Sequence, residues 1–156
     1  MLVDSNIFIY AANLDSQQCV ELFDRCRKGS VDGLITTVTL AECCHRWMML
    51  EAVQKKFIAG SNPAKTLSSK PGVIKNLTDY AARVNGLIHG TLQIRSVETE
   101  DFVAALQLQR RWGLLTNDSL QLAVAERLGI NEIATADSHF DAIQGLMVYK
   151  PDDLAA

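Results

Sequence analysis

The chain has 156 residues, a length at which one domain removes roughly 70% of the unfolded chain's surface from water. Hydrophobic residues make up 48% of the sequence and charged residues 21%, which excludes a disordered polyelectrolyte. A net charge of −3 argues against a protein that holds nucleic acid by bulk positive charge. Local basic strips stay possible, with candidates at Lys55, Lys56, Lys65, Lys70, Arg110 and Arg111.

No apolar run approaches the roughly 20 residues that a membrane span requires, and the first residues do not resemble a secretory signal. We therefore expect a cytoplasmic protein without a membrane partner. The four cysteines contain no Cys-x-x-Cys pair, and His45 directly follows Cys44, which is poor spacing for one ion. Buried, reduced thiols are expected rather than a disulfide framework or a zinc site.

Short apolar segments alternate with amphipathic ones in the first half of the chain. The predicted order is a strand at 1–3, helices at 6–12 and 16–28, a strand at 34–36 and a long helix at 38–57. The stretch from Gly60 to Gly72 is rich in turn residues and lysine, so it is predicted to be a mobile loop. A helix at 73–90 follows, and with the long helix it predicts a helical hairpin arm.

The second half continues the alternation of strands and helices. We expect a strand at 92–97, a helix capped by Thr99, a helix from 116 to 128, a strand at 133–135, a short helix at 138–143 and a strand at 146–148. This order is typical of an α/β fold, a three-layer α/β/α sandwich with a mostly parallel central sheet. We expect a single domain over residues 1–156.

Four acids fall where predicted strands end or helices begin. Asp4 and Asp137 follow strands, and Glu42 and Asp118 lie in the first turns of helices. In right-handed parallel units each strand delivers the chain to one edge of the sheet, and the next helix starts there. The four carboxylates are therefore expected to meet at one edge of the sheet.

Carboxylates within a few ångströms of one another repel unless protons or divalent cations compensate them. Ligand sets made of oxygen select hard cations such as Mg²⁺. A site of this kind suits phosphodiester hydrolysis, because a metal makes a bound water more acidic and stabilises charge on the phosphate. The sequence offers no Ser-His-Asp or Cys-His arrangement that competes with this interpretation.

Each acid also has a structural explanation when it is considered alone. Asp4 could be a polar strand end, Asp137 a helix N-cap, and Asp118 a carboxylate stabilised by its helix dipole. Glu42 could complete a capping box with Thr39, three residues earlier. Caps have no reason to gather at one edge of a sheet, so the joint placement favours a site.

Four segments resemble those of the PIN-domain ribonucleases, in particular the compact toxins of VapC type. The matching segments are Leu2–Tyr10, Thr36–Glu42, Leu115–Ala123 and Ile133–Asp137. Their order and rough spacing are similar to those of the family over nearly the whole chain. The opening segment and the Thr-x-Asp at Thr116 are the more specific matches, and the region from Val53 to Ile88 is longer than the family core.

The resemblance implies a metal-dependent endoribonuclease in which Asp4, Glu42, Asp118 and Asp137 hold Mg²⁺ or Mn²⁺. It further implies that Asn6 and Thr116 orient the acids and that Asp141 is an additional acid, although Asn6 could equally be a helix N-cap. An RNA substrate, homodimers and a small antitoxin as partner are further implications. The expected role is the toxin of a type II toxin-antitoxin pair.

Other functions remain as alternatives. The chain could be an RNA-processing nuclease that is not a toxin, or a catalytically silent PIN-like binding module, although no acid is missing from the set. A phosphatase with an aspartyl nucleophile fits less well because residue 6 is Asn6 rather than an acid, and no glycine-rich turn indicates a dinucleotide site. The helix face around Trp47 and Phe57 is either core or partner surface.

Overall fold

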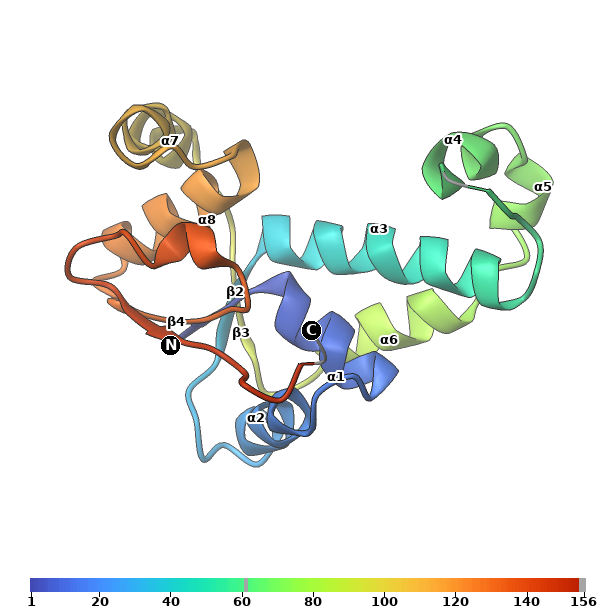
Figure 1. The fold of residues 1–156 in the computed structure, drawn as a ribbon, viewed down its shortest axis with the longest axis horizontal. Coiled ribbons are helices and arrows are strands. Elements are labelled where there is room, and N and C mark those ends of the chain that lie inside the picture. Colours follow the sequence, from blue (N-terminus) through green and yellow to red (C-terminus); the bar gives the residue numbers. More distant parts are fainter. Residues whose placement is uncertain (61, 155–156) are drawn as a thin grey trace.

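A five-stranded parallel sheet forms the centre of the computed structural model, which describes residues 1–60 and 62–154 (Figure 1). The strands are β1 (Leu2–Val3), β2 (Leu34–Thr36), β3 (Gln93–Arg95), β4 (Glu132–Ala134) and β5 (Met147–Tyr149). They lie in the order β3-β2-β1-β4-β5, and each neighbouring pair is parallel. The predicted mostly parallel sheet is confirmed. Its order reverses direction at β1, which is the position where open α/β sheets bind ligands.

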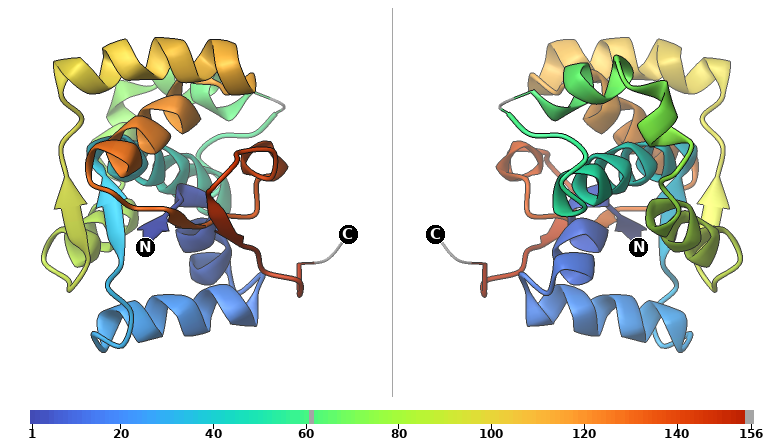
Figure 2. Two further views of the ribbon diagram at one scale, coloured as in Figure 1. Left: turned by 90° about the vertical axis from the view of Figure 1, so that its left-hand side faces the viewer. Right: turned by 90° about the vertical axis from the view of Figure 1, so that its right-hand side faces the viewer.

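Helices cover both faces of the sheet, which confirms the three-layer sandwich (Figure 2). One face carries α1 (Ser5–Asn13) and α2 (Gln17–Arg27), and the other carries α7 (Thr99–Trp112) and α8 (Thr116–Arg127). Successive strand residues point to opposite cores, so Val3 packs with α1 and α2 while Leu2 packs with α7 and α8. The central strands β1 and β2 are buried on both faces, and this explains why they are mostly apolar, whereas the edge strands β3 and β5 are partly exposed.

The predicted helical arm is present and extends away from the sheet (Figure 1). It consists of α3 (Thr37–Gln54), α4 (Pro63–Ser68), α5 (Pro71–Ile74) and α6 (Asp79–Ile88). The outer part of the arm has a small core of its own, formed by Ala52, Ile58, Leu67 and Leu77. The arm is therefore a packed structure rather than two bare helices.

Two predictions for the arm were wrong. The segment 60–72, apart from Ser61, which lies outside the described residues, is not a continuous loop, because Pro63 and Pro71 begin the short helices α4 and α5. Proline suits the first turn of a helix because its missing N–H would have no partner there. The helix expected at 73–90 begins instead at Asp79, after α5 has ended and the chain has turned.

The start of α6 is fixed by Glu51, a buried side chain of α3. Its carboxylate accepts hydrogen bonds from the amides of Thr78 (2.9 Å) and Tyr80 (2.8 Å) and pairs with Lys55 Nζ at 2.6 Å. Burial alone would raise the pKa of Glu51, but Lys55 and the backbone amides lower it to about 2. Glu51 thus acts as an N-terminal cap for a helix that begins 28 residues later in the chain.

Smaller differences concern the ends of helices. The cap of α7 is Glu98, which forms a reciprocal capping box with Asp101, and not Thr99 as predicted. The helix expected at 138–143 is only a 3₁₀ turn, η1 (Ser138–Phe140). The cysteines are free thiols as expected, three of them buried and Cys44 half-buried. Among the described residues, no helix is long and apolar enough to cross a membrane.

Candidate active site

Asp4 lies at the centre of the carboxyl edge of the sheet, directly after β1. It is 5% exposed, and its carboxylate accepts hydrogen bonds from four neutral groups. Oδ1 accepts from Ser5 N (2.7 Å) and Gln121 Nε2 (3.3 Å), and Oδ2 accepts from Asn6 Nδ2 (2.6 Å) and Thr135 Oγ1 (2.7 Å). These donors fix the orientation of the carboxylate without neutralising its charge.

Asn6 connects the end of β1 to the end of β4. Its Nδ2 donates to Asp4 and to Thr135 Oγ1 (3.0 Å), and its Oδ1 accepts from the amide of Ala136 (3.1 Å). The N-cap of α1 is Asp4 and not Asn6, so the alternative interpretation of Asn6 as a cap was wrong. The contacts are those of a residue that orients the acids.

Two orienting residues, Thr135 and Gln121, were not predicted from the sequence. Thr135 is fully buried, and its Oγ1 lies between the two acids, donating to Asp4 and accepting from the amide of Asp137 at 3.0 Å. Gln121 is also fully buried and bridges Asp4 to Thr39 Oγ1 (3.2 Å). The sequence signal that could have identified them is a polar residue within an apolar segment, because a polar side chain that becomes buried there needs a hydrogen-bond partner.

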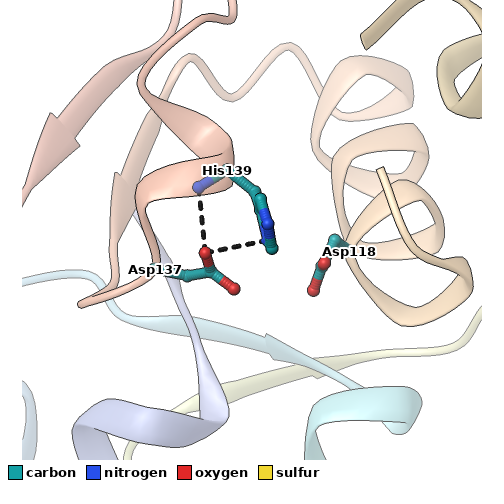
Figure 3. A group of neighbouring side chains, drawn as sticks. All are labelled: Asp118, Asp137 and His139. Atoms are coloured by element: carbon teal, nitrogen blue, oxygen red, sulfur yellow. Dashed lines mark hydrogen bonds and ion pairs between the residues drawn. The ribbon is translucent and has the colours of Figure 1, made fainter. Parts of the chain in front are cut away.

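Asp118 and Asp137 face each other across the edge, with His139 beside them (Figure 3). One ligand atom of each of these three residues lies within 4.8 Å of the others. Asp118 comes from the first turn of α8, and Asp137 caps η1 by accepting from the amide of His139 at 2.9 Å. His139 Nδ1 is also 3.0 Å from Asp137 Oδ1. His139 was not among the residues predicted from the sequence.

The charge of the whole edge acts on Asp118. Burial first, and then the negative charges of Asp4, Asp137 and Glu42, raise the pKa of Asp118 to about 6, with His139 opposing. Charges change the pKa of a carboxylate this strongly only when they lie close to it. Asp4, Asp137 and Glu42 therefore lie close enough to Asp118 for their charges to act on it, and a single site formed by all four acids stays a prediction.

Glu42 is half-buried in the second turn of α3, as are Asp118 and Asp137 at their own positions. The capping box of α3 pairs Thr36 with Thr39, so the proposed box between Thr39 and Glu42 was wrong. No hydrogen bond to the Glu42 carboxylate is found in the described part of the chain. The carboxylate is thus available to a ligand.

Thr116 and Asp141 are less involved than the acids. Thr116 is the exposed first residue of α8, and its carbonyl accepts from Ser119 Oγ at 2.9 Å. Asp141 is exposed and pairs with Lys150 Nζ at 2.5 Å, beyond the end of β5. Its charge is thereby compensated by Lys150.

The sequence pattern of the PIN domain matches residues 1–146. The chain belongs to the PIN domain family. No curated protein sequence matches the chain significantly.

Several solved structures share the fold of this PIN domain. VapBC2 from Rickettsia felis, bound to a promoter DNA fragment, is 18% identical with a TM-score of 0.55, covering 97% of this chain and 98% of that one. FitAcB from Neisseria gonorrhoeae is 15% identical with a TM-score of 0.53 and 95% coverage of both chains. A toxin–antitoxin complex from Klebsiella pneumoniae is 18% identical with a TM-score of 0.51, covering 96% and 98%. At these identities the likeness establishes the fold alone.

The edge of this PIN domain fits a divalent cation. Among the described residues, no lysine or arginine forms an ion pair with Asp4, Glu42, Asp118 or Asp137. Carboxylate oxygens make up most of the donor set and suit hard cations, while His139 adds one imidazole nitrogen. A cation at this position would compensate charges that the protein leaves without a counter-ion.

Proposed function

We propose that this PIN domain is a divalent-metal-dependent endoribonuclease that hydrolyses RNA phosphodiester bonds as the toxin of a type II toxin-antitoxin pair. The observation that carries the proposal is the grouping of Asp118 and Asp137 within 4.8 Å, in the field of Asp4 and Glu42, without a cationic partner from lysine or arginine. Membership of the PIN family supports the same chemistry. A non-toxin processing nuclease and a silent binding module are the alternatives.

Asp4, Asp118, Asp137 and Glu42 would hold Mg²⁺ or Mn²⁺ in this proposal. The ion would make a coordinated water more acidic and would stabilise the charge that develops on the phosphate and the leaving oxygen. The protein's own contribution is to fix the donors. Thr135 and Asn6 hold Asp4 against the segment that follows β4 and leads to Asp137. Preorganised donors of this kind need no rearrangement when substrate binds.

The direct test is Asp118→Asn, which keeps the size of the side chain and removes its charge. We expect loss of RNA cleavage by more than about 100-fold, with unchanged circular dichroism, because a substitution that only disturbs a ligand's support costs 10–100-fold. Treatment of the wild-type protein with EDTA should abolish cleavage in the same way, and added Mg²⁺ or Mn²⁺ should restore it. Asp15→Asn, at an exposed acid after α1, is the matched control. Cleavage that persists in Asp118→Asn and in EDTA would exclude the proposed chemistry.

The toxin role and the partners need their own measurements. Expression of the chain alone should arrest bacterial growth, and Asp118→Asn should relieve the arrest; a processing nuclease would not be toxic. A gene for a small antitoxin directly upstream is expected.

A homodimer in the cytoplasm completes the proposal, and light scattering should then give twice the 17.2 kDa chain mass. Exposed Phe102, Val103 and Leu106 on α7 offer apolar surface that a partner chain would cover.

A further inference from the structure

The outer arm is strongly basic in a protein that is acidic overall. Residues 52–78 contain five lysines and no acidic residue, whereas the whole chain carries −3, so the remaining residues carry −8. Large charge asymmetry within a small domain indicates a surface for a charged partner. A negatively charged partner would be attracted to the arm and repelled by most of the remaining surface.

Four of these lysines are free to meet a partner. Lys55 is engaged with Glu51 and Asp79, at 2.6 and 3.0 Å. The side chains of the other four are exposed, and within the described ranges none forms an ion pair; they are Lys56, Lys65, Lys70 and Lys75. They come from the end of α3, from α4, from the turn before α5 and from the turn after it. We refer to these four lysines as the arm lysines.

An exposed aromatic ring lies among the arm lysines. Phe57 is 41% exposed, and its carbonyl accepts from Lys70 Nζ at 3.2 Å. It lines a shallow cavity of about 380 Å³ together with Lys70, Gly72, Val73 and Asn76. Cations beside an exposed ring form the combination that holds single-stranded nucleic acid, because phosphates pair with the cations and a base stacks on the ring. Lysine is depleted at protein–protein interfaces, so a protein partner fits less well.

The arm is placed where a bound polymer can reach the acidic edge. α4 and α5 lie at the far end of α3, on the same side of it as α7, while α2 lies on the opposite side (Figures 1 and 2). At a rise of about 1.5 Å per residue, Lys55 lies about 20 Å along α3 from Glu42. A single strand that keeps the stacked spacing of a duplex strand, about 3.4 Å per nucleotide, covers that length in about six steps.

We propose that the arm lysines and Phe57 bind the backbone and one base of a single-stranded RNA segment whose scissile bond lies at the acidic edge. The inference rests on the proposed function and adds a substrate-binding surface to it. Since the binding surface and the acids are about six nucleotide steps apart, the arm contributes to long substrates and not to very short ones.

The test measures binding of a fluorescein-labelled single-stranded RNA of about 12 nucleotides, twice the estimated span, by anisotropy at several salt concentrations. All proteins carry Asp118→Asn so that the RNA stays intact. The arm variant combines Lys56→Gln, Lys65→Gln and Lys75→Gln. Its control combines Arg25→Gln, Arg27→Gln and Lys28→Gln, an equal charge change at exposed positions at the end of α2. Circular dichroism checks the fold of each protein.

The logarithm of the binding constant falls linearly with the logarithm of the salt concentration, and each lost phosphate contact makes this slope shallower by about 0.7. With three lysines replaced, the arm variant should have a slope shallower by about 2 and should bind roughly 100-fold more weakly at 0.1 M salt. The control should bind as its parent does. Phe57→Leu should weaken binding at least about fivefold and leave the slope unchanged, because stacking is lost but no charge is. Tyr149→Leu, at an exposed ring on β5, is its control.

Equal losses in the arm variant and its control would show an effect of net charge alone and would overturn the inference. The inference also fails if the arm variant binds RNA normally but loses affinity for an acidic polypeptide such as polyglutamate. Cleavage assays keep the two proposals separate. With Asp118 restored, the arm variant should cut a trinucleotide normally and the longer RNA poorly. If the enzyme cuts RNA but the arm variant behaves like wild type, the proposed function stands and the inference about the arm fails. If RNA binds through the arm but is not cut, the binding surface stands and the proposed function fails.

Discussion

Two carboxylates of this PIN domain, Asp118 at the sheet edge and Glu51 in the arm, show opposite electrostatic behaviour. Glu51 is buried with Lys55 and two backbone amides, which lower its pKa to about 2. Asp118 is half-buried among other acids, and its pKa is raised to about 6. The protein thus supplies a counter-charge where a carboxylate supports the fold and omits one at the edge.

The same distinction separates the other acids. Asp101 is buried between α7 and α8, where Arg127 binds it at 2.7 and 2.9 Å and lowers its pKa. Asp4 is equally buried, but its four donors are neutral. Burial alone therefore does not identify a site. The useful criterion is a buried or half-buried acid whose partners orient it and leave its charge uncompensated.

Removing the Glu51 carboxylate, which has counter-charges in the arm, should have the largest effect on the stability of the protein. Glu51→Ala leaves the amides of Thr78 and Tyr80 without an acceptor and Lys55 without its closer partner, and we expect it to cost about 3 kcal/mol in free energy of unfolding. Urea denaturation measures the loss. Glu21→Ala, at an exposed glutamate of α2, should change stability by less than about 0.5 kcal/mol. Hydrogen exchange should accelerate in α6 before it does in β1 and β4; equal acceleration everywhere would mean that the arm is not a separate unit.

Removing a side chain that orients Asp4 and Asp137 at the sheet edge should lower metal affinity more than it lowers the stability of the fold. Thr135→Val keeps the shape of the side chain but removes the hydroxyl that connects Asp4 and Asp137, so we expect metal affinity to fall about 10–100-fold. Titration of Mn²⁺ followed by calorimetry measures this affinity. Thr66→Val, which removes a hydroxyl that contacts only a backbone carbonyl in the arm, is the control. An unchanged Mn²⁺ affinity in Thr135→Val would remove Thr135 from the site.

The order of strands and helices was sufficient to predict where the acids lie. Asp4 and Asp137 follow strands, and the rule that parallel strands end at one edge brings them together without any knowledge of side-chain contacts. The positions of Glu42 and Asp118 required only one further step each. This part of the site follows from local sequence and topology.

The parts that were missed depend on contacts between residues far apart in the chain. Glu51 caps α6 through a contact that spans 29 residues, from Glu51 to Tyr80, and no local pattern encodes it. Thr135 and Gln121 resemble ordinary strand and helix residues until burial reveals that their polar atoms need partners. Asp141 matched a family position, but its pairing with Lys150 depends on where the chain passes after β5.

The smallest expected effect sharpens the comparison through pH. Asp118 has a pKa raised from 3.8 to about 6, so its contribution to stability is fully present below pH 4 and is lost as the pH rises through 6. Without metal, the stability of wild type relative to Asp118→Asn should fall by on the order of 1 kcal/mol between pH 4.5 and 7, a value reduced because the half-exposed carboxyl is screened by solvent. Saturating Mg²⁺ should abolish the fall, since the cation replaces the proton. Glu51 has the opposite sign, because its lowered pKa stabilises the fold above pH 4.5 and that stability is lost as the pH falls towards 2. A fall for Asp118 that Mg²⁺ does not remove would show that the carboxyl responds to burial alone and that no ion binds beside it.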